Sequence, residues 1–146
     1  MMTSLILDHF IPYRLSVASN AVSTRISASY RKRFGLKVPE WRLIAILAEG
    51  HEMTPLALGN IARIDKISVS RAAAALITRG LVMQRANPGD GRSHLLSLTT
   101  DGASLYAEIA PAARAMEAEL LSGFSARERA MLDRLLRRIA EAAESR

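Results

Sequence analysis

The sequence predicts a mainly helical domain that contains one small β-hairpin, and three observations support this fold class. Apolar residues recur at helical spacing through most of the 146 residues. One region reads as a pair of short strands on either side of a turn. Proline and glycine stand where the helical patterns begin and end. Because 49% of the residues are hydrophobic, the chain is able to build a true core.

Composition narrows the possible functions. The formal net charge of +6 favours polyanionic partners, nucleic acid first, although an arginine-rich surface also serves solubility alone. The chain has no cysteine, which excludes disulfides and thiol redox chemistry. Its three histidines are far apart, so we expect no metal site and no cofactor. No apolar run is long enough to span a membrane and no signal peptide is recognisable, which favours a cytoplasmic protein.

The first helical pattern covers residues 5–34 and carries most of its apolar residues on one face. Pro12 is expected to begin the regular part of this helix or to kink it, since proline donates no backbone hydrogen bond. Gly35 is expected to end it in the left-handed conformation. A second, shorter helix begins near Pro39, and its Trp41 is expected to anchor the core.

Two short helices follow in quick succession. Thr54 is a typical N-cap and Pro55 a typical first residue for the first of them. The second is predicted in the stretch KISVSRAAAALITRG, which ends on Gly80. Two helices with so tight a connection form a helix-turn-helix candidate.

A β-hairpin is predicted directly after this helix pair. The stretches LVMQRA, residues 81–86, and HLLSLT, residues 94–99, are rich in β-compatible residues. The stretch NPGDGRS lies between them and contains the residues that accept turn geometry. We therefore expect a loop that is longer than a two-residue turn.

Two further helices complete the chain. Pro111 is expected to bend or break the first of them. Ser125 and Glu128 match a capping box at the start of the second, which carries leucines on one side and arginines largely elsewhere. The predicted architecture is mainly α with a small β-hairpin wing, that is, a winged helix-turn-helix with helices at both ends.

In a winged helix-turn-helix the second helix of the pair enters the DNA major groove, and side chains near its N-terminus meet base edges. The candidates for these contacts are the cationic and hydroxyl residues at the start of that helix: Lys66, Ser68, Ser70 and Arg71. A structural role is the alternative for each. Ser68 can simply cap the helix, and Arg71 can simply lie in solvent.

The hairpin tip would reach the neighbouring minor groove, where an arginine gains mainly electrostatic energy. Arg92 is the candidate for this contact. Asp90 either holds Arg92 in one direction, by accepting a hydrogen bond from its guanidinium or from the loop backbone, or is simply a turn residue. The sequence allows both roles.

These segments resemble the MarR family of transcription regulators. The resemblance rests on WRLIAILAEG, on LALGNIARIDKISVSRAAAALITRGLV and above all on the wing motif DGRSHLLSLTTDG, and it extends over nearly the whole chain. Gln84 departs from the pattern, because many members carry a basic residue there, and the adjacent Arg85 joins the candidate DNA contacts. The resemblance implies a DNA-binding regulator, typically a repressor that a small, often aromatic ligand releases.

The resemblance also implies a homodimer on a pseudo-palindromic operator of double-stranded DNA. Independently, the terminal helices carry more apolar residues than a small monomer usually exposes, although these residues can also pack within one chain. In a single MarR-like domain over residues 1–146 we expect a DNA-binding lobe at 36–99 and dimerisation helices at 5–34 and 100–143. The expected dimer contacts are Phe10, Ile11, Leu120, Leu121, Phe124, Leu132, Leu135 and Leu136.

A ligand pocket between the dimer helices and the lobe follows from the same resemblance. By position, the residues near it are His9, Tyr13, Arg14 and Trp41. The sequence has no Gly-rich phosphate loop, nucleophile elbow or pair of carboxylates, so we do not expect an enzyme. The competing interpretation is a winged-helix module that binds another protein instead of DNA.

Overall fold

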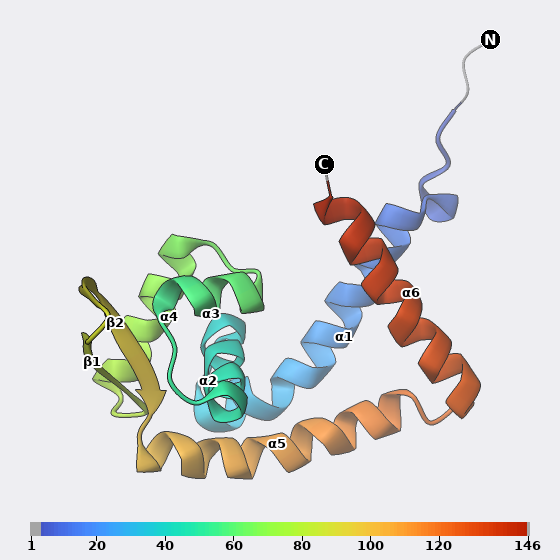
Figure 1. Cartoon of the computed structure of the whole chain (residues 1–146). Coiled ribbons are helices and arrows are strands. Elements are labelled where there is room, and N and C mark those ends of the chain that lie inside the picture. Colours follow the sequence, from blue (N-terminus) through green and yellow to red (C-terminus); the bar gives the residue numbers. More distant parts are fainter. Residues whose placement is uncertain (1–3, 146) are drawn as a thin grey trace. The chain divides into compact units, whose positions relative to one another are not determined.

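A computed structural model describes residues 4–145 of the chain (Figure 1). Its helices and strands are, in order, the 3₁₀ turn η1 (Leu7–His9), α1 (Ile11–Phe34), α2 (Val38–Gly50), α3 (Pro55–Ala62), α4 (Lys66–Thr78), β1 (Val82–Asn87), β2 (Asp90–Leu98), α5 (Thr100–Leu120) and α6 (Ala126–Glu144). This order confirms the mainly helical fold class with a two-stranded antiparallel hairpin. Within the described residues, no helix combines the length and apolarity that a membrane span requires.

The chain divides into two compact units. The first extends to Ala113 and the second starts at Arg114, so the boundary falls inside α5. The first unit holds the hydrophobic core, because α2, α3, α4, the hairpin and the first part of α5 all contribute buried side chains to it. The second unit consists of the end of α5, a turn and α6.

The core fixes the helix-turn-helix and the hairpin as one packed lobe. Leu58 of α3, Leu76 of α4 and Leu96 of β2 are almost completely buried. Trp41 is half-buried and stacks between Tyr30 of α1 and Tyr106 of α5, with ring centroids 5.6 and 5.8 Å apart. The expectation that Trp41 anchors the core is therefore confirmed.

Most predicted helix ends agree with the structure. Gly35 ends α1 with a φ of 66°. The Thr54 hydroxyl accepts a hydrogen bond from the Ala57 amide at the start of α3, and Ser125 and Glu128 form the expected capping box of α6. Of the two roles expected for Pro12, it begins the regular part of the first helix. The helix α1 starts at Ile11, later than the pattern from residue 5, and the residues before it form only the short turn η1.

Of the two outcomes expected at Pro111, a bend or a break, the break does not occur, since α5 continues through this proline. Pro111 removes one backbone hydrogen bond from the helix. The residues at 110, 112, 113 and 115 around it are alanines, which have the highest helix propensity. Their helix propensity offsets the hydrogen bond lost at Pro111, so the helix continues beyond the proline.

The loop of the hairpin is also shorter than predicted. The strands extend into the polar stretch, and only Pro88 and Gly89 connect them. The Asn87 side chain accepts a hydrogen bond from the Gly89 amide and donates one to the Ser93 hydroxyl, which closes the turn. The register shifts between Ala86 and Asn87, so the tip of the hairpin is irregular although both strands reach it.

The end of the hairpin joins α5 through a close backbone approach. Thr99 donates its hydroxyl to the Gly80 carbonyl and accepts a hydrogen bond from the Gly102 amide. Gly102 is buried so near the Leu81 carbonyl that a Cβ there would overlap it. This contact explains physically why the wing motif ends on glycine.

Candidate nucleic-acid interface

The helix α4 starts from an aspartate cap. The Asp65 carboxylate accepts a hydrogen bond from the Ser68 amide and a second from the Ser68 hydroxyl, both 2.8 Å long. These bonds to the charged form lower the pKa of Asp65. The N-cap is thus Asp65 and not Ser68, but the Ser68 hydroxyl is engaged as a donor to that cap.

The two faces of α4 differ sharply. Val69, Ala72, Ala73 and Leu76 are buried against the rest of the lobe. The opposite face is exposed and carries Ile67, Arg71, Ala74 and Thr78 at spacings of three and four residues. Within residues 4–145 the Arg71 guanidinium and the Lys66 ammonium have no hydrogen-bond or ion-pair partner, so both cations are available to an external anion.

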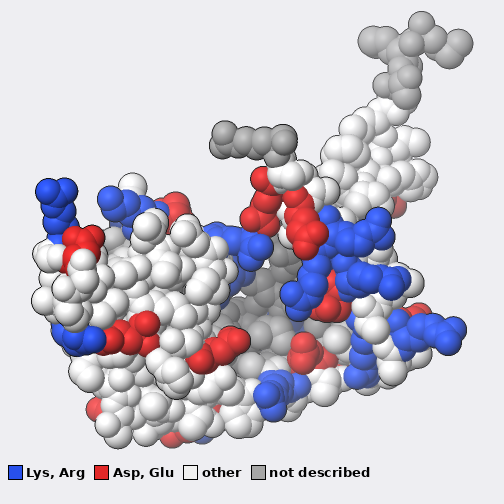
Figure 2. All heavy atoms as spheres, in the orientation of Figure 1, with Lys and Arg blue, Asp and Glu red and all other residues white. Residues whose placement is uncertain are grey.

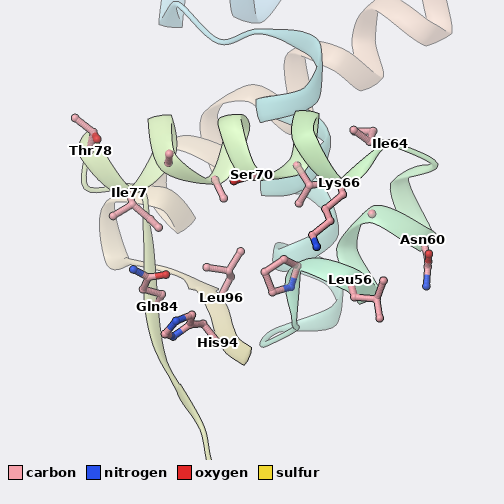
Figure 3. A pocket seen from close by; sticks show the side chains of 15 residues that line it. Leu56, Asn60, Ile64, Lys66, Ser70, Ile77, Thr78, Gln84, His94 and Leu96 are labelled. Atoms are coloured by element: carbon pink, nitrogen blue, oxygen red, sulfur yellow. The ribbon is translucent and has the colours of Figure 1, made fainter. Parts of the chain in front are cut away.

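A pocket of about 800 Å³ lies between α3, α4 and the hairpin (Figure 3). Lys66 and Ser70 line it from α4, whereas Gln84 and His94 line it from the two strands. Figure 3 shows these side chains directed toward the same space from both sides. The fold therefore brings Lys66, Ser70 and Gln84 to one surface, although they are distant in sequence.

The tip of the hairpin exposes Arg92 and Asp90. The Asp90 carboxylate accepts a hydrogen bond from the backbone amide of Arg92 at 3.0 Å. In the described part of the chain the Arg92 guanidinium itself has no partner, and basic and acidic side chains stand at the hairpin end in Figure 2. Asp90 therefore accepts from the loop backbone and not from the guanidinium of Arg92.

Arg85 is separated from these residues. Its guanidinium donates two hydrogen bonds to Glu52, from Nε at 2.6 Å and from Nη2 at 2.7 Å. Gln84 lines the pocket beside α4, and because strand residues alternate in direction, Arg85 points to the other face. The bonds from Arg85 lower the pKa of Glu52. Arg85 thus ties strand β1 to the connection between α2 and α3.

The four residues predicted near a ligand pocket do not meet within one chain. His9 ends η1, and Tyr13 and Arg14 lie in the first turn of α1, where Arg14 pairs with Asp8 at 3.1 Å. Trp41 contacts Tyr30, which follows Tyr13 by 17 residues. At the rise of an α-helix this separation is about 25 Å. Any site that used all four residues would need a second protein copy.

The predicted dimer residues are largely exposed. Phe10, Ile11 and Phe124 are between 40% and 61% exposed, whereas Leu120 and Leu121 are half-buried. On α6, Leu132, Leu135 and Leu136 share one face and remain 39–45% exposed. The described residues of this chain therefore leave an apolar stripe along α6.

Two residues of this region were not predicted from the sequence. Ile67 belongs to the outward face of α4, and the heptad-like spacing of 67, 71, 74 and 78 was a signal that could have revealed it. Glu52 pairs with Arg85, which is 33 positions further along the chain. No local pattern in the sequence indicates that pair.

Comparison with known proteins agrees with this geometry. Residues 34–93 match the model of the MarR family. The multiple antibiotic resistance protein MarR of Salmonella typhimurium is 25% identical over 139 residues, which cover 94% of this chain and 96% of that protein.

Two solved structures extend the likeness over the full length. A MarR family regulator of Silicibacter pomeroyi DSS-3 is 28% identical, with a TM-score of 0.81 and coverage of 97% of this chain and 100% of that one. NadR in complex with 4-hydroxyphenylacetate is 26% identical, with a TM-score of 0.79 and coverage of 99% and 100%. The chain is therefore similar over nearly its whole length to winged helix-turn-helix transcriptional regulators of the MarR family, and its residues 34–93 match the family model, as its wing motif predicts.

Proposed function

We propose that this chain is a sequence-specific repressor that binds a pseudo-palindromic operator as a homodimer. The observation that best supports DNA binding is the outward face of α4, where Arg71 is exposed and has no partner within residues 4–145. Arginine binds guanine bidentately in the major groove, and each such contact is worth about 1–3 kcal/mol of discrimination. Lys66 and Ser70 border the same face, and Arg92 extends the contact to the neighbouring minor groove.

Dimerisation is the second part of the proposal. A stripe of leucines on α6 and apolar residues around the start of α1 are exposed to water in a single chain. Burying them between two copies removes this apolar surface from water and sets two α4 helices at a fixed distance. We assign residues 36–99 to DNA binding, and residues 5–34 and 100–143 to dimerisation.

The third part is a small aromatic ligand that releases the DNA. The complex of NadR with 4-hydroxyphenylacetate supports this part. Such a ligand releases DNA only if it binds the non-operator conformation more tightly, and it would then change the distance between the two α4 helices. His9, Tyr13 and Arg14 of one copy and Trp41 of the other are the proposed contacts.

DNA binding is tested with the intergenic DNA upstream of the gene for this protein. The wild-type chain should shift this duplex, and its affinity should fall steeply as the salt concentration rises. Arg71→Ala should change base preference as well as affinity, because it removes a base contact. If the protein binds no duplex even at low salt, DNA binding is overturned. The chain is then the alternative, a winged-helix module that binds another protein.

Ligand response needs a separate experiment. Hydroxyphenylacetate, other phenolics and aromatic acids are titrated into the preformed DNA complex while its anisotropy is followed. Release by at least one of them supports the ligand-responsive repressor. If none of these compounds weakens operator binding, the ligand response is overturned, but the proposal of DNA binding is unaffected.

A further inference from the structure

The first turn of α4 exposes an isoleucine where a polar residue would be ordinary. Ile67 is 64% exposed and is absent from the residues that pack against the hydrophobic core of the lobe. Isoleucine is β-branched and has a lower helix propensity than the leucine, lysine or glutamate that suit an exposed helical position. Neither packing nor local helix stability accounts for this side chain.

The neighbours of Ile67 define the surface to which it belongs. Arg71 follows one turn later on the same exposed face, and Ala74 and Thr78 continue that face. Four residues of an α-helix rise by about 6 Å, and successive bases along a strand are about 3.4 Å apart. For a helix that lies along the groove, Ile67 and Arg71 are therefore about two base-pair steps apart.

The major groove offers one apolar group to such a side chain, the C5-methyl of thymine. We propose that Ile67 reads a thymine in each half-site by packing on this methyl group, about two base pairs from the base that Arg71 contacts. The inference rests on the proposed function, because it requires α4 to lie in the major groove. It adds a specificity determinant that carries no charge and makes no hydrogen bond.

The chemistry separates this role from the electrostatic contacts. Deoxyuridine pairs like thymidine but lacks the methyl group, so it removes contacts to that methyl and leaves the hydrogen-bonding groups of the base in place. Burying one methyl group changes a binding constant about fourfold. The expected loss is therefore about fourfold for each half-site that carries the substitution.

The experiment starts from duplexes selected by the wild-type protein from a randomised pool. Each thymine of the selected half-site is then replaced in turn by deoxyuridine, and dissociation constants are measured by fluorescence anisotropy. Wild type should lose about fourfold per half-site at one position. Ile67→Ala should bind the thymine and deoxyuridine duplexes equally, and Ile67→Val should discriminate less than wild type.

A matched control comes from α3. Ile61 is also exposed, at 51%, but it belongs to α3 and not to the outward face of α4 that carries Ile67 and Arg71. Ile61→Ala should keep the full discrimination between thymine and deoxyuridine. Circular dichroism of both variants shows that the helices are retained.

The outcomes separate this inference from the function on which it rests. If selection enriches no DNA sequence, the proposed function is overturned, and this inference with it. If a sequence is selected but wild type tolerates deoxyuridine at every position, or Ile67→Ala still discriminates, only the thymine-reading role is overturned. An Ile67→Ala variant that loses no DNA discrimination but fails to bind a protein partner would assign the exposed isoleucine to that partner.

Discussion

At the scale of single residues, the two arginines of the hairpin have opposite surroundings. Arg92 is exposed at the tip and its guanidinium has no partner among residues 4–145, whereas Arg85 forms a bidentate ion pair with Glu52. Bidentate pairs combine two charge-assisted hydrogen bonds in a fixed geometry. Arg92 can therefore bind a DNA phosphate directly, whereas Arg85 can do so only after its ion pair with Glu52 is broken.

This difference predicts distinct salt dependences for two matched variants. Arg92→Ala should weaken DNA binding and reduce the slope of log affinity against log salt by about 1, the value for one lost phosphate contact. The loss should be greatest on A·T-rich flanks, where the minor groove is narrow and most negative. Arg85→Ala should leave the slope unchanged. An Arg92→Ala slope equal to that of wild type would show that the wing tip makes no contact.

Asp90 can be tested through the kind of acceptor it provides. Asp90→Asn keeps an oxygen for the Arg92 amide and removes a negative charge near the DNA, so binding should be as tight as in wild type or tighter. Asp90→Ala removes the acceptor and should weaken binding, because the direction of Arg92 is lost. Equal weakening of both variants in anisotropy titrations would instead assign Asp90 to a charge pair with the guanidinium.

The ion pair between Glu52 and Arg85 predicts a pH dependence of stability. Hydrogen bonds from Arg85 lower the pKa of Glu52 in the folded state below its usual 4.5. The stabilisation is therefore fully present above pH 4.5 and is lost as the pH falls through the lowered pKa. Thermal unfolding should show wild type more stable than Glu52→Gln at neutral pH, with the gap closing in acid. A gap that is independent of pH would exclude the charged pair as its cause.

At the scale of secondary-structure elements, the hairpin and α5 depend on one close contact. Gly102 lies against the Leu81 carbonyl, and Thr99 bonds to both sides of this junction. Gly102→Ala should destabilise the fold by about 1–3 kcal/mol, the usual cost of forcing an extra methyl group into a packed site. Chemical denaturation measures this difference.

The control for that variant is another glycine of the chain. A Cβ at Gly123 meets nothing within 4 Å, so Gly123→Ala should change stability by no more than about 0.5 kcal/mol. If both variants unfold at the same denaturant concentration as wild type, the backbone around Gly102 can shift to accept a methyl group, and the predicted destabilisation is wrong.

At the scale of the whole molecule, the apolar stripe on α6 predicts the oligomeric state. Wild type should have twice the 15.9 kDa mass of one chain in light scattering. Replacing Leu132 and Leu135 together with aspartate should halve this mass and weaken operator binding, because each half-site is then bound alone. Leu56→Asp changes an exposed leucine of α3 and should leave the mass unchanged. A monomeric wild type would overturn the dimer part of the proposal.

Local rules in the sequence determined most of the fold. The positions of Thr54, Gly35 and Ser125 are governed by backbone dihedral angles and by hydrogen bonds within four residues, so their roles as caps are predictable. The helix-turn-helix, the hairpin and the resemblance to the MarR family also follow from such local patterns. The hairpin loop is shorter than predicted and no break occurs at Pro111, because side-chain bonds at the tip and neighbouring alanines outweighed single-residue preferences.

Only the tertiary structure decided which side chains of α4 and the hairpin are exposed and which are already engaged. It paired Arg85 with Glu52, committed Ser68 to the Asp65 cap, and left Ile67 and Arg71 exposed together. These assignments depend on which side of α4 and of β1 packs against the lobe. That choice is set by burial of the whole core, an energy shared among residues far apart in the chain.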